Sequence, residues 1–90
     1  MADHVRIDKW LWHARFYRTR VLAQSAAARG VIRLNGNRVE KFSVNVCPGD
    51  VLTLPQGREI MVVRVTGLAL RRGSAGEARL LYEILAETPA

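Results

Sequence analysis

Positively charged and aromatic side chains are concentrated near the start of the chain. Residues 6–20, with the sequence RIDKWLWHARFYRTR, contain five Arg or Lys and four aromatic residues. Guanidinium and ammonium groups bind phosphate, and flat rings stack on unpaired bases, so this combination predicts a surface for nucleic acid. The same segment holds a single acidic residue, Asp8, which cannot neutralise all five cations.

The charge of the whole chain is distributed unevenly. Residues 5–41 carry nine Arg or Lys against two acidic residues, whereas residues 42–90 carry five of each. The net charge of +6 therefore comes from the first half of the chain. Such asymmetry is typical of a protein that meets a polyanion through one face.

Candidate RNA ligands fall in two regions. In the first, Arg20 would stand at the first turn of a helix, beside backbone amides without partners, with Arg18 and Thr19 next to it. The second is an expected β-hairpin. The residues predicted to contact RNA are Arg6, Lys9, Arg15, Arg18, Thr19, Arg20, Asn35, Arg38 and Lys41. Two alternatives stay open: Arg20 pairs with Asp8, and Asn35 serves only the turn.

Three ring-bearing residues near the cations have competing interpretations. Trp12 and Phe16 lie outside the expected apolar face, so they either stack on bases or pack beneath a loop. His13 is expected to be a surface or hydrogen-bonded residue, because a proton-transfer catalyst needs a partner that the neighbouring sequence lacks. The loop containing Arg71 and Arg72 is expected to be solvated.

Two helices must position the first region. Asp8 is a plausible N-cap for a helix from Lys9, and a core-facing stripe follows from helical spacing. Thr19 is the expected N-cap of a second helix that runs to Arg29 and stops at Gly30. The stripe of the first helix is Ile7, Trp10, Leu11, Ala14 and Tyr17, and the inner face of the second is Leu22, Ala23, Ala26 and Ala27.

Strands follow the helices. Asn35-Gly36 between residues 31–34 and 37–39 is a strong hairpin signal, and turns at 48–50 and 55–57 flank two further strands. Ser74 to Glu77 has capping-box spacing, which favours a helix from Ala75 to about Tyr82, although Leu80–Leu85 can equally pair as an edge strand. The predicted fold class is α+β: two packed N-terminal helices, then a small, mostly antiparallel β-sheet and a possible short C-terminal helix.

Composition limits the alternatives. Ninety residues suit one domain spanning 1–90. Cys47 is the only cysteine, so no internal disulfide forms; it is expected to be a small buried hydrophobe, in a protein of the reducing cytoplasm. Cys and His are not clustered as a structural metal site requires, and no run is long enough to cross a membrane. We expect no metal, no cofactor and no small-molecule substrate.

Five short motifs occur in order over about half of the chain: Arg6-Ile7-Asp8-Lys9, Thr19-Arg20, Gly30-Val31, Asn35-Gly36 and Gly49-Asp50. Together they resemble the alpha-L RNA-binding motif, the domain named after ribosomal small-subunit protein four. The motif would cover about 5–67, with 68–90 as a C-terminal extension. The Trp-rich helix, the Arg71-Arg72-Gly73 loop and the segment after it further resemble the stand-alone fifteen-kilodalton ribosome-associated heat-shock proteins of bacteria.

The resemblance implies a non-catalytic protein that binds structured ribosomal RNA. In that subfamily the partner is the large ribosomal subunit, in rescue or recycling of subunits that hold a nascent chain on transfer RNA. A bare alpha-L motif is expected to read the shape of RNA through phosphates and sugars.

Other functions remain to be weighed. The helix-turn-helix start could read double-stranded DNA, but the second helix is Ala-rich and offers only Arg20, Gln24, Ser25 and Arg29 to base edges. Alpha-L motifs also accompany RNA-modifying enzymes, yet the carboxylates here are scattered and no activated nucleophile is recognisable, so no catalytic residue is predicted. A membrane-surface role is the weakest, because the basic helix has no broad apolar face.

Overall fold

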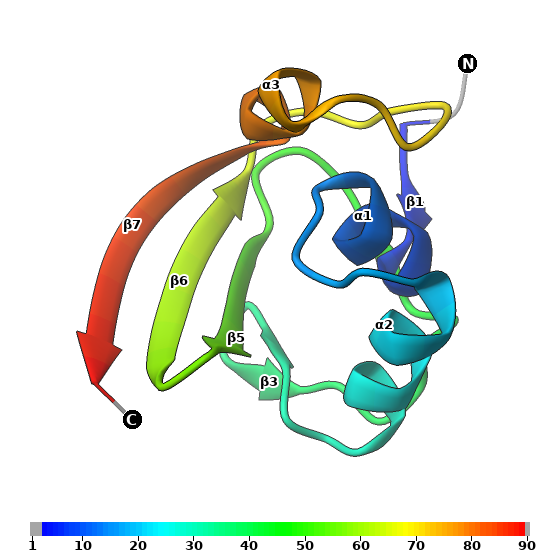
Figure 1. Cartoon of the computed structure of the whole chain (residues 1–90). Helices are drawn as coiled ribbons and strands as arrows, with labels where there is room; N and C mark the ends of the chain where they lie inside the picture. Colours follow the sequence, from blue (N-terminus) through cyan, green and yellow to red (C-terminus); the bar gives the residue numbers. More distant parts are fainter. Residues whose placement is uncertain (1–2, 90) are drawn as a thin grey trace.

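The computed structural model describes residues 3–89. A five-stranded antiparallel sheet with the order β3-β2-β5-β6-β7 curves along one side, and α1 and α2 lie on the other (Figure 1). The fold is α+β, as predicted. Its elements are β1 (Val5–Arg6), α1 (Ile7–His13), α2 (Arg20–Ala28), β2 (Arg33–Leu34), β3 (Asn37–Arg38), β4 (Asn45–Val46), β5 (Val51–Gln56), β6 (Glu59–Val65), α3 (Ala75–Ala78), a 3₁₀ turn (Arg79–Leu81) and β7 (Tyr82–Pro89).

Helix α1 buries the predicted stripe but starts earlier than expected. Its first residue is Ile7, and the N-cap position belongs to Arg6, whose side chain makes no capping hydrogen bond. The prediction that Asp8 caps the helix is therefore wrong, because Asp8 lies inside the first turn and is fully buried. The helix ends at His13, so Tyr17 reaches the core from the following loop and is only half-buried.

Helix α2 begins where the sequence predicts and ends at Ala28, one residue before the predicted Arg29. The Thr19 hydroxyl accepts a hydrogen bond from Leu22 N at 3.1 Å, and Gly30 follows the helix with φ +75°. The three inner alanines are buried against α1, which their small size allows. Leu22 was wrongly placed on the inner face; its side chain is about half exposed.

The β-hairpin also forms as predicted. Asn35 and Gly36 both have positive φ, as a two-residue turn of this type requires, and Leu34 pairs with Asn37 across it. The turn of the next hairpin begins two residues later than predicted. Strand β5 runs through Pro55 to Gln56, so the turn lies at Gly57-Arg58 instead of at 55–57.

The C-terminal segment combines both of its predicted forms. Ser74 and Glu77 make the expected capping box, and the helix with its 3₁₀ turn ends at Leu81. From Tyr82 the chain pairs with β6 as the edge strand β7. Strand β7 is antiparallel to β6, with an irregularity between Val62 and Val63.

One cluster of buried hydrophobic residues joins the helices to the sheet. Trp10 is fully buried, and its indole Nε1 donates to Gly67 O at 3.0 Å, which ties α1 to the loop after β6. Cys47 is exposed, so its expected burial is wrong; it lies in a turn where Asp50 accepts a hydrogen bond from its backbone N. Besides Trp10, the largest fully buried side chains of the hydrophobic cluster are Ile7, Leu11, Ile32, Leu52 and Leu54.

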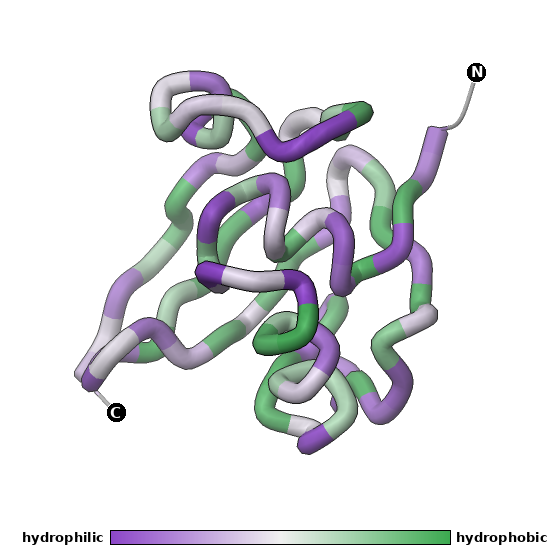
Figure 2. The backbone as a smooth tube through the Cα atoms, turned by 45° about the vertical axis from the view of Figure 1, so that its right-hand side comes forward, coloured by the Kyte–Doolittle hydropathy of each residue, from purple (hydrophilic) through white to green (hydrophobic). Residues whose placement is uncertain are grey.

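Hydrophobic and hydrophilic stretches alternate along the chain in short segments (Figure 2). Within residues 3–89, no helix is long and apolar enough to cross a membrane.

Candidate nucleic-acid interface

Asp8 is the centre of a polar cluster between α1 and α2. Its carboxylate accepts hydrogen bonds from Arg6 on both oxygens, at 3.2 and 3.1 Å. Across the helix pair, Arg20 Nε donates to Asp8 Oδ2 at 3.1 Å and Gln24 Nε2 donates to the same oxygen at 3.0 Å. The alternative in which Arg20 pairs with Asp8 is therefore correct.

The buried carboxylate is stable as an anion because its donors compensate for lost water. Burial acts to raise the pKa of Asp8, but hydrogen bonds from Gln24, Arg20 and Arg6 outweigh it and hold the pKa below its ordinary value. A charge in this position costs free energy unless it is paired and hydrogen-bonded, and here both conditions are met.

Pairing with Asp8 does not consume the arginines. Arg20 uses only Nε, and no hydrogen bond found in residues 3–89 involves its two terminal nitrogens. One terminal nitrogen of Arg6 likewise makes no hydrogen bond within residues 3–89. The side chains are 39% (Arg6) and 36% (Arg20) exposed, so two guanidinium groups held in fixed positions still offer donors to an outside anion.

The residues beside this cluster add to its positive charge. Arg18 and Thr19 are exposed immediately before α2, and the Thr19 hydroxyl, which accepts from Leu22, retains its own proton for donation. Lys9 follows Asp8 on α1 and is half-buried, with no ion pair to any acidic group in the described part of the chain. Arg18 and Thr19 adjoin Arg20 in the chain, whereas Lys9 lines a separate hollow with His4, Val5 and His13.

Arg38 of the hairpin lies at the other end of α2, beside Gly30. The guanidinium of Arg38 passes directly over Gly30, where an added Cβ would stand 2.3 Å from Arg38 Nε. Arg38 and Lys41 are exposed, and neither joins an ion pair within residues 3–89. The predicted site residues thus fall into two cationic groups, the Asp8 cluster with its neighbours and the pair Arg38 and Lys41, and Phe42 links the two groups through its contact with Arg6.

Asn35 has a structural role in the hairpin turn, as one of the two alternatives from the sequence states. Its amide donates to Asp50 Oδ1 at 3.1 Å and accepts from Val51 N at 2.8 Å, which joins the hairpin turn to the start of β5. Burial acts to raise the pKa of Asp50, but hydrogen bonds from Cys47 and Asn35 hold that pKa below its ordinary value.

Arg15 points toward the C-terminal half of the chain. Its Nε and Nη2 donate to Gly73 O at 3.0 and 2.9 Å, and its own φ of 64° ends α1 in the left-handed conformation. Two of its donors are therefore engaged with the loop before α3. Its predicted role in binding RNA stays a prediction.

The aromatic rings of α1 and of the loop after it pack against other parts of the protein. Phe16 lies between Trp10 and Tyr82, with ring centroids 5.9 and 4.7 Å away, so the packing alternative holds for Phe16. Trp12 is half-buried beneath Arg72, whose guanidinium lies 5.7 Å from the indole centroid while its Nε donates to Trp12 O. Arg72 is therefore not the solvated loop residue that was expected.

Contrary to expectation, His13 is not on the surface and makes no side-chain hydrogen bond within the described residues 3–89. It is only 5% exposed, and its Nδ1 has no hydrogen-bond partner among residues 3–89. Burial lowers its pKa, and the charges of Lys9 and Arg20 lower it further. A neutral imidazole results.

Two contributors were missed by the sequence analysis. Gln24 was considered only as a reader of DNA bases, although its position four residues after Arg20 puts both side chains on one helix face. Phe42 carries the Arg6 guanidinium 5.3 Å above its ring centroid, and nothing in the local sequence indicates this contact. Gln24 Nε2 donates to Asp8, so one of the four side chains that a DNA-reading helix would use is engaged inside the protein.

Comparison with known proteins agrees with this architecture. Residues 5–52 match the S4 domain family. The chain is 46% identical over 87 residues to heat shock protein 15 of Escherichia coli K12, covering 97% of this chain and 65% of the length of that protein. It is 39% identical over 83 residues to the RQC P-site tRNA stabilizing factor of Bacillus subtilis, covering 92% of this chain and 94% of that protein.

A solved structure of heat shock protein 15 from Vibrio cholerae, described as trimeric, has a TM-score of 0.87 to this fold. It is 41% identical in sequence, and the match covers 92% of this chain and 83% of that one. The family match spans more than half of the chain, and the relatives cover nearly all of it. The chain therefore belongs to the S4 domain family, the alpha-L family that its motifs resemble.

Proposed function

We propose that this protein is a non-catalytic RNA-binding protein that acts on ribosomes whose nascent chain remains attached to transfer RNA. The observation that carries the proposal is the pair of guanidinium groups, Arg6 and Arg20, fixed by buried Asp8 with donors left free. Fixed donors lose little conformational entropy when a phosphate binds. Arg18 and Thr19 extend the same surface, and Lys9 adds positive charge on α1.

The relatives support the biological setting. Heat shock protein 15 and the RQC P-site tRNA stabilizing factor are similar to this chain over nearly its whole length, and the second is named for a transfer RNA on the ribosome. We propose ribosomal RNA of the large subunit as the binding partner, with the transfer RNA of a stalled nascent chain within reach. Binding would use phosphates and sugars of folded RNA.

Sedimentation of a cell lysate through a sucrose gradient tests the proposal. The protein is expected to travel with free large subunits. The double variant Arg18→Ala/Arg38→Ala removes two exposed cations that hold no other residue in place, and it should shift the protein to the top of the gradient.

The matched control is Arg58→Ala/Arg79→Ala, which removes the same charge from exposed positions outside both cationic groups. This control should still travel with large subunits. Equal behaviour of the two double variants, or a wild-type protein that stays at the top of the gradient, would reject the proposed surface.

A further inference from the structure

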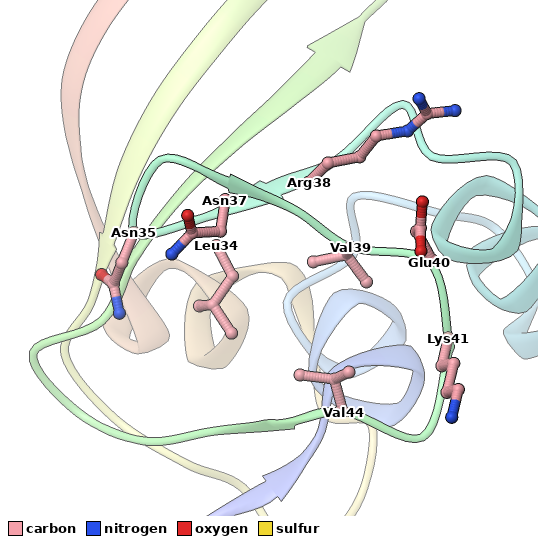
Figure 3. Close-up of a pocket in the computed structure, with 8 residues that line it drawn as sticks. All are labelled: Leu34, Asn35, Asn37, Arg38, Val39, Glu40, Lys41 and Val44. Carbon is pink, nitrogen blue, oxygen red and sulfur yellow. The ribbon is translucent and has the colours of Figure 1, made fainter.

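A pocket of about 380 Å³ lies between the β2–β3 hairpin and the segment 40–44. Leu34, Val39 and Val44 point into the space between the two segments (Figure 3). Asn37 lies toward the hairpin turn, and Glu40 and Lys41 lie on the opposite wall (Figure 3). The pocket therefore combines an apolar floor with a polar margin, and its volume is near the lower end of the range for small-ligand sites.

Backbone hydrogen bonds build both walls before any ligand arrives. Val39 N donates to Ile32 O at 2.9 Å, and Ile7 N donates to Val44 O at 2.7 Å. The second bond anchors the 40–44 segment to the first residue of α1. A pocket with fixed walls costs little ordering free energy when it is filled.

The margin offers hydrogen-bonding groups that the fold leaves unused. The Asn37 amide makes no hydrogen bond to any residue in 3–89, and it carries both a donor and an acceptor. The Glu40 carboxylate is exposed and can accept from an exocyclic amine. A flat, weakly polar ring with hydrogen-bonding edges fits both the floor and the margin, and nucleobases have this character.

Charge around the pocket identifies where such a base comes from. Arg38 and Lys41 line the pocket, and neither forms an ion pair in the described part of the chain. Phe42, in the segment that forms one wall, lies under the Arg6 guanidinium, so this segment also contacts the Asp8 cluster. A sugar-phosphate chain held by these cations would pass the mouth of the pocket.

We propose that this pocket receives one unpaired nucleobase of the RNA that the surrounding cations bind. The inference rests on the proposed function and adds a structural feature that the RNA must contain: a bulged or looped nucleotide. Extruding a base costs a few kcal/mol from a paired stack and least from an unpaired position, so a bulge is the favoured source.

The test uses two short RNA hairpins that differ by a single bulged nucleotide, each carrying a fluorophore for anisotropy. At low ionic strength a basic surface binds any RNA, so binding to both hairpins is measurable. The wild-type protein is expected to bind the bulged hairpin at least about fivefold more tightly, from the low end of the free energy of accommodating one base. A set with A, G, C or U at the bulge then identifies the preferred base.

Two pocket variants and one control complete the design. Val44→Phe fills the floor, and Asn37→Ala removes the free amide without breaking a hydrogen bond within residues 3–89; each should reduce the preference for the bulge while leaving affinity for the paired hairpin unchanged. Arg18→Ala should weaken both affinities equally and keep their ratio. Thermal unfolding checks that Val44→Phe folds, and Asn37→Ala tests the pocket independently.

The outcomes separate the two proposals. Equal wild-type affinity for both hairpins, or a preference that survives in Asn37→Ala and in folded Val44→Phe, overturns the base pocket while RNA binding itself stands. Failure to bind either hairpin overturns the proposed function, and the pocket inference with it.

Discussion

Arg20 reaches Asp8 through Nε alone, at 3.1 Å, and its two terminal nitrogens make no hydrogen bond within residues 3–89, so both are available for another partner. The contact crosses from α2 to α1, so one hydrogen bond both joins the helices and orients a binding group. A free arginine would lose side-chain entropy on meeting a phosphate, and here part of that loss occurs on folding. In the proposed interface, structure and binding therefore use different atoms of the same guanidinium.

Replacing the carboxylate should expose its structural role. Asp8→Asn keeps the shape but removes the charge that three donors surround, and it should lower the free energy of unfolding at pH 7 by about 1–3 kcal/mol. The folded-state pKa of Asp8 lies below the ordinary value of 3.8, so the charged form contributes stability above that pH. This contribution disappears as the pH falls through the lower folded-state pKa.

Urea unfolding of wild type and Asp8→Asn between pH 7 and pH 2.5 measures this difference. It should be constant above about pH 5 and shrink below the ordinary carboxylate pKa of 3.8. Glu87→Gln, at an exposed carboxylate on β7, is the control and should change little at any pH. A pH-independent difference for Asp8→Asn would show that its charge is not what stabilises the helix pair.

RNA binding should depend steeply on salt. If roughly five phosphates are neutralised, the slope of log affinity against log salt should be about −3 to −5. Arg18→Ala removes one exposed cation and should make the slope shallower by about 1, whereas Arg58→Ala on the β5–β6 turn should not change it. Filter binding across a salt series provides the measurement, and a flat response would remove the electrostatic basis of the interface.

Local patterns predicted the elements well because their causes are local. The stripe of α1, the Thr19 cap and the Asn35-Gly36 turn each depend on residues within one turn of helix or hairpin. Asp8 was misassigned for the complementary reason. Its sequence context suits an N-cap, but two of its three partners, Arg20 and Gln24, are 12 and 16 residues away and meet it only when the helices pack.

The ring residues illustrate the same limit on a larger scale. Phe16 packs on Tyr82 and Trp12 lies under Arg72, contacts that join the first helix to the last quarter of the chain. A helical wheel does not distinguish a ring that is free to stack on a base from a ring that a distant segment of the chain covers. The sequence could assign side chains near the helix start to a binding surface. Only the structure shows which of their donor atoms have no hydrogen-bond partner within residues 3–89.

Gly30 and Arg38 form a pair whose effects on stability and on binding can be separated. Gly30→Ala places a side chain at φ +75°, which costs roughly 1–2 kcal/mol, and its Cβ displaces the flexible guanidinium of Arg38. Gly57→Ala meets the same backbone penalty at φ +63° with open space around it. The two variants should lose similar stability in thermal unfolding.

Affinity for RNA should then distinguish them. Only Gly30→Ala moves Arg38, so only that variant should bind ribosomal RNA more weakly, by about two- to tenfold for one displaced phosphate contact. Equal affinities would mean that Arg38 does not contribute to the interface in the orientation seen here.

His13 should make the folded protein sensitive to mild acid. Because burial and two nearby cations hold its pKa below the ordinary value of 6.5, the unfolded chain takes up a proton that the folded protein resists. Stability from this residue is therefore present above pH 6.5 and declines as the pH falls toward the lower folded-state pKa. His13→Leu removes the proton-binding group together with the unpartnered Nδ1, so it should be close to neutral at pH 8.

Below pH 6.5 the same substitution should become increasingly stabilising relative to wild type, since only the wild type pays for burying or expelling an imidazolium. Denaturant unfolding at pH 8, 6 and 5 gives the required comparison. His4→Leu serves as the control, because His4 is exposed and its removal leaves the buried imidazole in place. Parallel pH profiles of His13→Leu and wild type would contradict this prediction. They would mean that His13 takes up its proton as readily in the folded protein as in the unfolded chain, which its burial beside Lys9 and Arg20 opposes.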